Sequence, residues 1–364
     1  RDADFPHQFK VIADFDDSVP RDAAGVQLYA GVLARLARDE QLPVFDRSAV
    51  AALCEHGVRI AAEPERITAR FGRVADLARE AAFLAGREGA DRVLRDHVED
   101  AVTRTRARVS LPARRFRRQL DAGRLSVTTR GRVVGQCNGL AVIHAGPIGH
   151  GFPARITASV GPGRGGTVNI EGEAGLSGAI HTKGFHILGG LMRNLLRTPH
   201  PLVFDASIAF EQSYGGIDGD SASGIEVCCL MSALTDLPLR QDMAMTGAID
   251  QLGNVLPIGG VNEKIEGFFD ACMDQGGVDG HGVIIPVSNV GDLQLAPRVL
   301  AAARDGTFTV HAVERIEQAL SLLLDREVGE RHAEGGPPPD SILGLAVARA
   351  RSFWESLEAR NPRQ

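Results

Sequence analysis

Lysine is rare in this sequence, which draws attention to the positions that keep it. Of the 40 lysine and arginine residues, three are lysines: Lys10, Lys183 and Lys264. An arginine stays charged, whereas a buried lysine can lose its proton and act as a base. Lys264 lies in LPIGGVNEKIEGFF, where a strand, a double glycine and the start of an apolar-faced helix would hold it rigidly. The alternative is an ordinary lysine on a helix surface, and rarity applies equally to Lys183.

A serine that such a base could activate lies earlier in the chain. Ser221 follows a strand-like run at 202–210 and a tight glycine turn, and we expect a helix whose first turn begins at Ser221. Free backbone N–H groups at a helix start would stabilise an oxyanion there. The alternative is that Ser221 only caps the helix, as serine often does. The histidines are scattered and lie in no local signature, so a Ser-Lys pair is the hypothesis to follow.

Other motifs exclude other chemistry. The segment GPGRGG at 161–166 satisfies GxGxxG but joins two strand-like runs, ARITASV and TVNIEG, so we expect a hairpin loop rather than a dinucleotide site. No GxxxxGK[ST] run occurs, so the chain has no phosphate-binding loop of that kind. The five cysteines form no CxxC pair, and we expect no metal site.

Composition bounds the partners and the compartment. The formal net charge of −6 argues against nucleic acid or an anionic membrane as the main partner. Six arginines between 106 and 118 could form a nucleic-acid patch, although a solvated helix face or linker is favoured. No apolar run approaches the roughly 20 residues of a spanning helix. An odd number of cysteines is a poor disulfide framework, so we expect a soluble, cytoplasmic protein.

The elements around these residues divide into a helical part and an α+β part. Apolar residues at three- and four-residue spacing predict four helices without a strand, and their starts are marked by Asp46 and Ser48 before the second helix and Asp91 before the fourth. Short β-type runs with glycine turns and helices then predict an α+β domain. Residues 1–21, with the strand-like run FKVIADF, are predicted to be a remnant of something longer. The helical bundle is predicted at 22–106, followed at 107–124 by a charged connector that Pro112 interrupts. The α+β domain is predicted at 125–325, and a linker with one amphipathic helix at 326–364.

Two short motifs carry a family resemblance. GDSAS at 219–223 and IGGVNEK at 258–264, with TGAIDQLGNVLPIGG between them, resemble the proteolytic domain of Lon-type ATP-dependent serine peptidases. The resemblance spans about residues 125–325, and its IHTKG and GDSAS variants are more similar to the Lon-B and Lon-C branches than to Lon-A. The helical part resembles the small lid of an AAA+ ATPase, and the opening segment resembles the end of the large ATPase subdomain.

The resemblance implies a role for each matching residue. Ser221 would be the nucleophile, Lys264 its general base, and Thr246 the residue that orients the lysine. Asp218 would pair with the lysine when the site is closed, which would raise the pKa of Lys264 and silence it. The oxyanion donors would be the backbone N–H groups of Asp220, Ser221 and Ala222, although Asp220 stands where the Lon-A type commonly has proline.

Lys183 matches a position that we expect to be structural. Arg70 or Arg73 would be the nucleotide-sensing arginine of the lid, and a plain surface arginine is the alternative.

The implied function is a serine endopeptidase with a Ser-Lys dyad that degrades unfolded or damaged polypeptides inside a homo-hexameric ring. Peptide hydrolysis would need no cofactor or metal, and ATP with Mg²⁺ would act only in the full-length protein. The alternative is a catalytically silent assembly or binding module of an AAA+ ring. Nucleic-acid binding is at most an accessory property.

Overall fold

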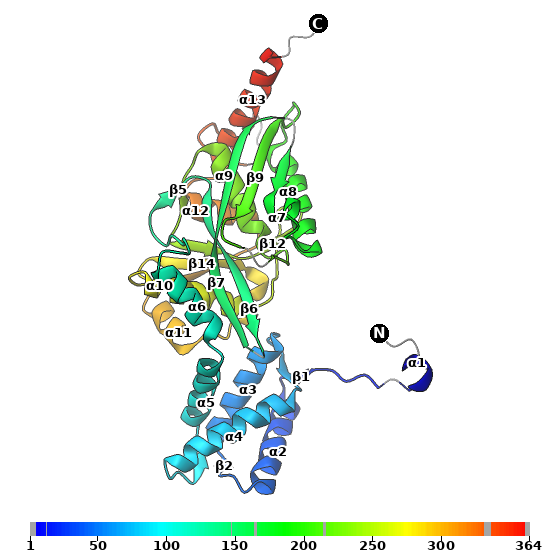
Figure 1. The fold of residues 1–364 in the computed structure, drawn as a ribbon, viewed down its shortest axis with the longest axis vertical. Coiled ribbons are helices and arrows are strands. Elements are labelled where there is room, and N and C mark those ends of the chain that lie inside the picture. Colours follow the sequence, from blue (N-terminus) through cyan, green and yellow to red (C-terminus); the bar gives the residue numbers. More distant parts are fainter. Residues whose placement is uncertain are drawn as a thin grey trace. The chain divides into compact units, whose positions relative to one another are not determined.

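The computed structural model describes residues 5–11, 13–146, 148–163, 166–213, 216–330 and 336–360. The chain forms two compact units, residues 1–108 and 109–364. The first is mainly helical, and the second combines a large sheet with helices (Figure 1). The predicted fold class, a helical part followed by an α+β part, is confirmed.

Four long helices form most of the first unit, and a capping residue marks the start of one of them as the sequence predicts. The Asp46 carboxylate accepts a hydrogen bond from the Ala49 N–H at 3.0 Å and caps the second long helix as predicted. Ser48 lies inside the first turn of that helix and donates to Asp46 at 2.7 Å. The last helix begins four residues after Asp91. The four helices are α2 (Ala23–Asp39), α3 (Arg47–Ala61), α4 (Phe71–Arg87) and α5 (Arg95–Arg108).

The first unit also contains short strands, so the expectation of helices alone is wrong. β1 (Ser18–Pro20) pairs antiparallel with β3 (Arg66–Thr68). β2 (Val44–Phe45) pairs parallel with β4 (Arg92–Val93). Strands of two or three residues are too short for the alternating apolar pattern that reveals longer strands in a sequence.

The opening segment does not form the strand that FKVIADF predicts. After α1 (Phe5–Gln8), residues 9–11 and 13–16 have no regular structure, and Ile12 lies outside the described residues. The side chains of Val11 and Phe15 are 88% and 91% exposed. A run of this kind becomes a strand only when another strand takes its backbone hydrogen bonds, and within the described residues none pairs with it.

A seven-stranded mixed sheet forms the centre of the second unit (Figure 1). Its strand order is β15-β14-β11-β6-β7-β9-β8. The β6, β7 and β9 pairings are antiparallel, whereas β6 with β11, β11 with β14, β14 with β15, and β8 with β9 are parallel. The bounds are β6 (Gln136–Ala145), β7 (Ile148–Pro162), β8 (Thr167–Asn169), β9 (Phe204–Phe210), β11 (Met243–Met245), β14 (His281–Pro286) and β15 (Phe308–Val313). Two smaller pairs join β5 (Arg132–Val133) to β10 (Leu239–Arg240), and β12 (Ala248–Ile249) to β13 (Val255–Leu256).

The glycine segment at 161–166 does not close the predicted hairpin. β7 and β8 flank this segment, but both pair with β9, which lies between them in the sheet. Residues 164 and 165 lie outside the described residues. The sequence shows two neighbouring strand-like runs but gives no sign that a later strand inserts between them.

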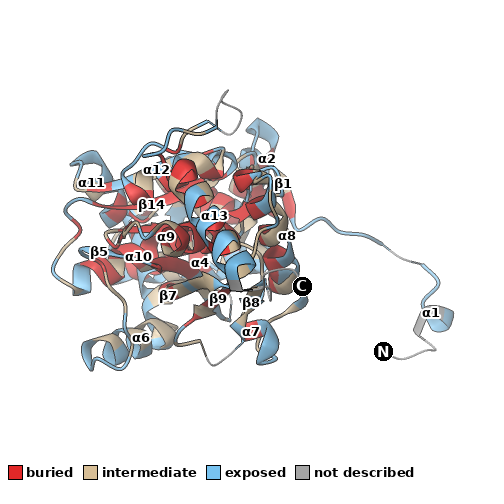
Figure 2. Ribbon diagram, turned by 90° about the horizontal axis from the view of Figure 1, so that it is seen from above, coloured by how far each residue is buried: buried red, intermediate tan, exposed pale blue. Residues whose placement is uncertain are grey.

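One helix of the second unit is buried on nearly all sides. In α9 (Ser223–Thr235), 11 of the 13 residues are buried, which is why its sequence is apolar without a polar face (Figure 2). It packs against β7 and against α8, α12 and α13. The other helices are α6 (Leu111–Asp121), α7 (Ile170–Glu173), α8 (Ala179–Leu196), α10 (Val261–Asp274), α11 (Pro297–Arg304), α12 (Ile316–Leu324) and α13 (Ile342–Arg360), with a 3-10 helix η1 (Val287–Asp292).

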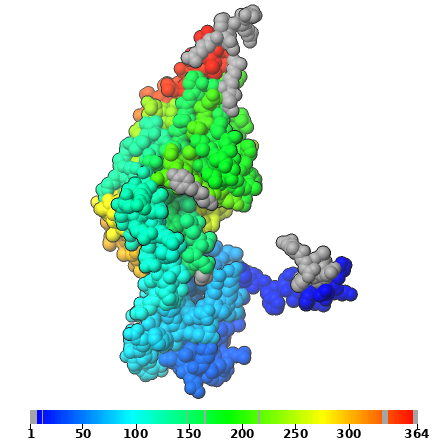
Figure 3. All heavy atoms as spheres, viewed as in Figure 1, coloured from blue at the N-terminus to red at the C-terminus, as the bar shows by residue number. Residues whose placement is uncertain are grey.

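The segment predicted as a connector contains α6, which lies on the outside of the second unit (Figure 3). Pro112 stands in its first turn, where proline costs no hydrogen bond. The Phe116 ring packs on Phe152 of β7 with centroids 4.8 Å apart. Arg117, one of the six arginines, pairs with Asp274 at 2.6 Å.

The predicted C-terminal helix docks on the second unit. α13 buries one apolar face against α9 and α8. The Trp354 ring of this helix stacks on His200, with centroids 5.2 Å apart.

Candidate active site

Ser221 lies in the turn that leads into α9. The helix begins at Ser223, two residues later than predicted, and Ala222 is its N-cap residue. The Ser221 side chain does not serve as the cap, because its Oγ accepts a hydrogen bond from Lys264 Nζ at 2.8 Å. Ser223 closes the turn instead, since its Oγ donates to the Asp220 carbonyl oxygen at 2.8 Å. The serine hydroxyl at 221 is thereby available to the lysine.

Thr246 completes a hydrogen-bonded group of three side chains. Lys264 Nζ donates to Thr246 Oγ1 at 3.1 Å, and that hydroxyl donates to the Ser221 carbonyl oxygen at 3.2 Å. Thr246 is fully buried, and Lys264 is 4% exposed. The Gly247 N–H, next in the chain, also donates to the Ser221 carbonyl oxygen, at 2.8 Å. The structure therefore brings Ser221, Lys264 and Thr246 together and fixes the serine backbone.

Glycines let α10 hold Lys264 close to the sheet. A Cβ on Gly151 of β7 would lie 1.8 Å from the Glu263 carbonyl oxygen, and one on Gly267 would lie 2.1 Å from the Gly151 carbonyl oxygen. Backbone therefore meets backbone where α10 crosses β7. Gly260, at the N-cap of α10, has a φ of +68°, which glycine adopts readily. Lys264 follows four residues later on a helix that has little room to shift.

Burial makes the Lys264 ammonium more acidic, so that part of the lysine is neutral and can act as a base. Removal from water disfavours the ammonium form and lowers the pKa of Lys264 to about 8, against a smaller opposing effect of the Asp220 carboxylate. A neutral amine is then present in a useful fraction of molecules near neutral pH. A general base performs best when its pKa lies near the working pH.

Asp218 does not bond to Lys264 in this structure. Its Oδ1 accepts hydrogen bonds from the backbone N–H groups of Gly219 at 2.9 Å, Ile180 at 3.2 Å and His181 at 3.4 Å. These bonds, with that of Gly219 the strongest influence, lower the pKa of Asp218. The carboxylate thus holds the start of α8 and does not make the pairing with Lys264 that the resemblance implies for a closed site.

The backbone before α9 offers donors for an oxyanion. Within the described residues, the N–H groups of Asp220, Ser221 and Ala222 donate to no acceptor. They precede a helix whose N-terminus attracts negative charge. This is the arrangement that stabilises a tetrahedral intermediate on a carbonyl carbon.

The two candidate nucleotide-sensing arginines lie in the first unit. Arg70 is the N-cap residue of α4, and its Nη2 lies 2.5 Å from Asp17 Oδ2. Arg73 is exposed on the same helix. Within the described residues no group of three or more His, Cys, Asp or Glu side chains could hold a metal ion, and no helix is long and apolar enough to cross a membrane.

Sequence reasoning missed a second buried polar group beside this turn. His181, Glu226 and Glu171 are 2%, 1% and 4% exposed. Glu226 carried one signal, because it is the single acidic residue in the otherwise apolar run GIEVCCLMSAL. A lone carboxyl in such a run is seldom buried without a reason.

Comparison with known families defines the class of protein. The model of an archaeal LonB AAA+ ATPase lid domain matches residues 44–108, and that of the Lon protease (S16) C-terminal proteolytic domain matches residues 208–326. The chain therefore belongs to the Lon protease family and carries a lid domain followed by a protease domain.

Individual relatives agree with this assignment. A Lon protease homolog of Haemophilus influenzae is 43% identical over 238 residues, which cover 63% of this chain and 40% of the relative. A Lon protease homolog of Escherichia coli is 34% identical over 318 residues, which cover 86% of this chain and 54% of the relative. An archaeal Lon protease of Archaeoglobus fulgidus is 30% identical over 301 residues, which cover 81% of this chain and 45% of the relative. The chain thus spans about half the length of the curated relatives that it matches.

Proposed function

We propose that this chain is a serine endopeptidase in which Ser221 is the nucleophile and Lys264 the general base. The single observation that carries the proposal is the 2.8 Å hydrogen bond between Lys264 Nζ and Ser221 Oγ, made by a lysine that is 4% exposed. Burial of a lysine costs free energy, because it destabilises the charged ammonium form. A lysine with a purely structural role would gain nothing that offsets this cost.

Proton transfer organises the reaction. Neutral Lys264 takes the proton of Ser221 Oγ as the oxygen attacks the peptide carbonyl carbon. The N–H groups around Asp220, Ser221 and Ala222 stabilise the oxyanion that forms. The Lys264 ammonium then gives its proton to the leaving amine, which breaks the C–N bond and leaves an ester on Ser221. Lys264 next removes a proton from water, which attacks the ester, and the proton returns to Ser221 as the acid product leaves.

Thr246 orients the base throughout this cycle. Its hydroxyl accepts from Lys264 and donates to the Ser221 backbone, so the lysine has one fixed direction in which to act. This contact also compensates the buried amine for the water that it lost.

The substrates that fit best are unfolded or damaged polypeptides. An extended chain can bring a peptide carbonyl to the partly exposed Ser221 more readily than a folded protein can. We place the protein in the cytoplasm as a homo-hexamer, with ATP and Mg²⁺ acting through further parts of a longer protein. The five cysteines are free and buried, which fits a reducing compartment. Arg70 or Arg73 would then sense the nucleotide.

Cleavage of unfolded casein without nucleotide tests the proposal. Ser221→Ala and Lys264→Ala should each abolish cleavage, while Lys183→Ala, which removes an exposed lysine, should cleave at the wild-type rate. Cleavage that survives Ser221→Ala would contradict the proposal. Absence of cleavage in a folded, ring-forming wild-type protein would favour the second candidate, a silent assembly module of an AAA+ ring.

A further inference from the structure

A second group of buried titratable side chains lies beside the turn that carries Ser221. His181 of α8, Glu226 of α9 and Glu171 of α7 take no part in the proposed reaction. His181 Nε2 lies 3.8 Å from Glu226 Oε1, and no described residue makes a hydrogen bond with this nitrogen. Buried polar atoms of this kind are rare, so their arrangement calls for an explanation.

The residues around His181 connect α8 directly to the turn of residues 217–220. The Gly178 N–H donates to the Ile217 carbonyl oxygen at 2.7 Å. A Cβ on Gly178 would lie 2.3 Å from Asp218 Cγ, and a Cβ on Gly184 would lie 3.1 Å from Asp220 Cβ. The glycines therefore let the Asp218 and Asp220 side chains of the turn pack directly against the backbone at the start of α8 and one turn later.

His181 faces the same turn. Positions 178, 181 and 184 recur every three residues, which places them along one side of a helix. The His181 backbone N–H donates to Asp218 Oδ1 at 3.4 Å. The backbone of Gly219 also acts on the imidazole, in the direction that raises the pKa of His181. Gly219 has a φ of +94° and lies two residues before Ser221. His181 thus contacts the turn at Asp218, next to Gly219.

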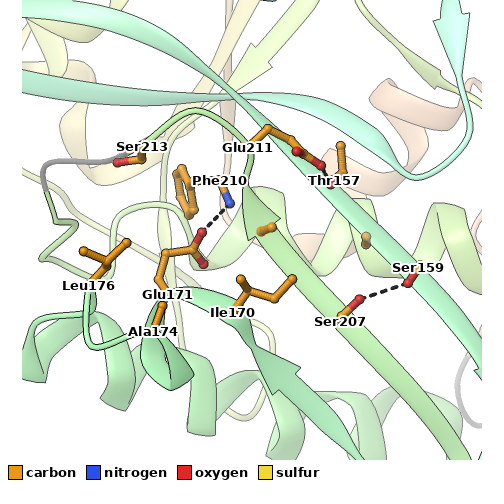
Figure 4. A pocket seen from close by; sticks show the side chains of 12 residues that line it. Thr157, Ser159, Ile170, Glu171, Ala174, Leu176, Ser207, Phe210, Glu211 and Ser213 are labelled. Atoms are coloured by element: carbon orange, nitrogen blue, oxygen red, sulfur yellow. Dashed lines mark hydrogen bonds between the residues drawn. The ribbon is translucent and has the colours of Figure 1, made fainter.

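The opposite side of the imidazole is enclosed. Its ring packs edge-on against Phe210 with centroids 5.7 Å apart, and the Phe210 N–H donates to Glu171 Oε1 at 2.7 Å (Figure 4). Glu171 also lines a pocket of about 540 Å³ between β7, β9 and α7 that contains neither Ser221 nor Lys264 (Figure 4). His181 therefore has one orientation, set from behind by Phe210 and Glu226.

Burial disfavours the charged forms of Glu226 and His181. Burial, and secondarily repulsion by Glu171, raises the pKa of Glu226 to about 8. Burial lowers the pKa of His181, against the opposing effects of Glu171, the Gly219 backbone and Asp218. Near neutral pH the histidine therefore faces a mainly protonated carboxyl at Glu226.

We propose that His181 is a positioning residue: enclosed by Glu226 and Phe210, it holds the turn of residues 217–220 in the conformation that presents Ser221 to Lys264. His181 does not touch the reacting atoms. The inference rests on the proposed function for its effect on catalysis, but its effect on the turn is independent of it.

Two variants of His181 and one matched control test the proposal. His181→Phe keeps an aromatic ring against Phe210 but removes both nitrogens, and His181→Asn keeps a donor. His186→Phe makes the same change at an exposed histidine of the same helix. Hydrogen exchange of the Gly178 and Gly219 amides reports on the turn, and peptide cleavage reports kcat and KM separately.

In His181→Phe, the two amides should exchange at least about tenfold faster, and kcat should fall at least about tenfold with KM unchanged. His181→Asn should recover part of both losses, and His186→Phe should match the wild type. Unchanged exchange and kcat in His181→Phe would overturn the proposal. If His181→Phe does not fold, His181→Asn becomes the deciding variant. Amide exchange and kcat at wild-type values in His181→Asn would then overturn the proposal. Faster exchange, together with cleavage that survives Ser221→Ala, would support the positioning role and refute the proposed peptidase mechanism.

Discussion

Two buried polar groups of the second unit respond to burial in opposite chemical ways. In the group around Ser221, burial lowers the pKa of Lys264 to about 8. In the group around His181, burial raises the pKa of Glu226 to about 8. The cause is the same, because a low-dielectric surrounding penalises whichever form carries charge. The lysine becomes a base, and the carboxyl becomes a proton carrier with no charge.

The groups differ in what surrounds the shifted residue. Lys264 has two hydroxyl partners, and one of them, Ser221, is partly exposed. Glu226 and His181 are each at most 2% exposed, so no substrate reaches them. A shifted pKa marks a candidate site only when a reactive, accessible atom lies within reach of the shifted group.

The largest expected effect is on kcat, in a variant that keeps the positive charge of Lys264 but removes its ability to act as a base. Lys264→Arg keeps a positive charge but cannot lose its proton, so kcat for a fluorogenic peptide should fall by about 10²- to 10⁴-fold. Lys183→Arg, the same change at an exposed position, should leave kcat unchanged. An active Lys264→Arg protein would show that the lysine contributes only its charge.

Stability should follow pH in opposite directions in the two groups. Folding raises the pKa of Glu226 from an ordinary 4.5, so its contribution is full below about pH 4.5 and is lost as the pH rises through about 8. Folding lowers the pKa of Lys264 from 10.5, so its penalty is full below about pH 8 and is relieved between about pH 8 and 10.5.

Denaturant unfolding across this pH range measures both contributions. Each proton contributes at most about 1.4 kcal/mol per pH unit to the free energy of unfolding. Glu226→Gln should flatten the fall between about pH 4.5 and 8, and Lys264→Met should flatten the rise above about pH 8. Parallel curves for the wild type and both variants would show that neither pKa is shifted by folding.

A smaller effect tests how Lys264 is held. Gly151→Ala should lower the free energy of unfolding by about 1–3 kcal/mol, because its Cβ would strike the Glu263 carbonyl oxygen of α10. Gly161→Ala in the same strand, where a Cβ meets nothing within 4 Å, is the matched control. Equal free energies of unfolding for the two variants, measured with urea, would mean that α10 can move away from β7 at little cost.

Much of the candidate site could be predicted because its residues lie in short, contiguous motifs. GDSAS and IGGVNEK name Ser221 and Lys264 directly, and the structure brings these two residues and Thr246 within hydrogen-bonding distance. The predicted start of α9 was two residues too early, because the sequence does not reveal that Ser223, rather than Ser221, closes the turn.

The remaining features depend on contacts between distant parts of the chain. The insertion of β9 between β7 and β8 leaves no mark on the segment that joins them. The position of Asp218 depends on α8, which precedes it by more than 20 residues. His181 and Glu226 acquire their relation only when α8 packs against α9.

The central claim is that Lys264 activates Ser221, and covalent labelling tests it most directly. The protein is exposed to a fluorophosphonate, and the adduct is located by peptide mass spectrometry at several pH values. The account predicts one adduct on Ser221, formed faster as the pH approaches 8, and nearly absent in Lys264→Ala. Labelling of Ser221 at the same rate in Lys264→Ala, or an adduct on another serine alone, would contradict it.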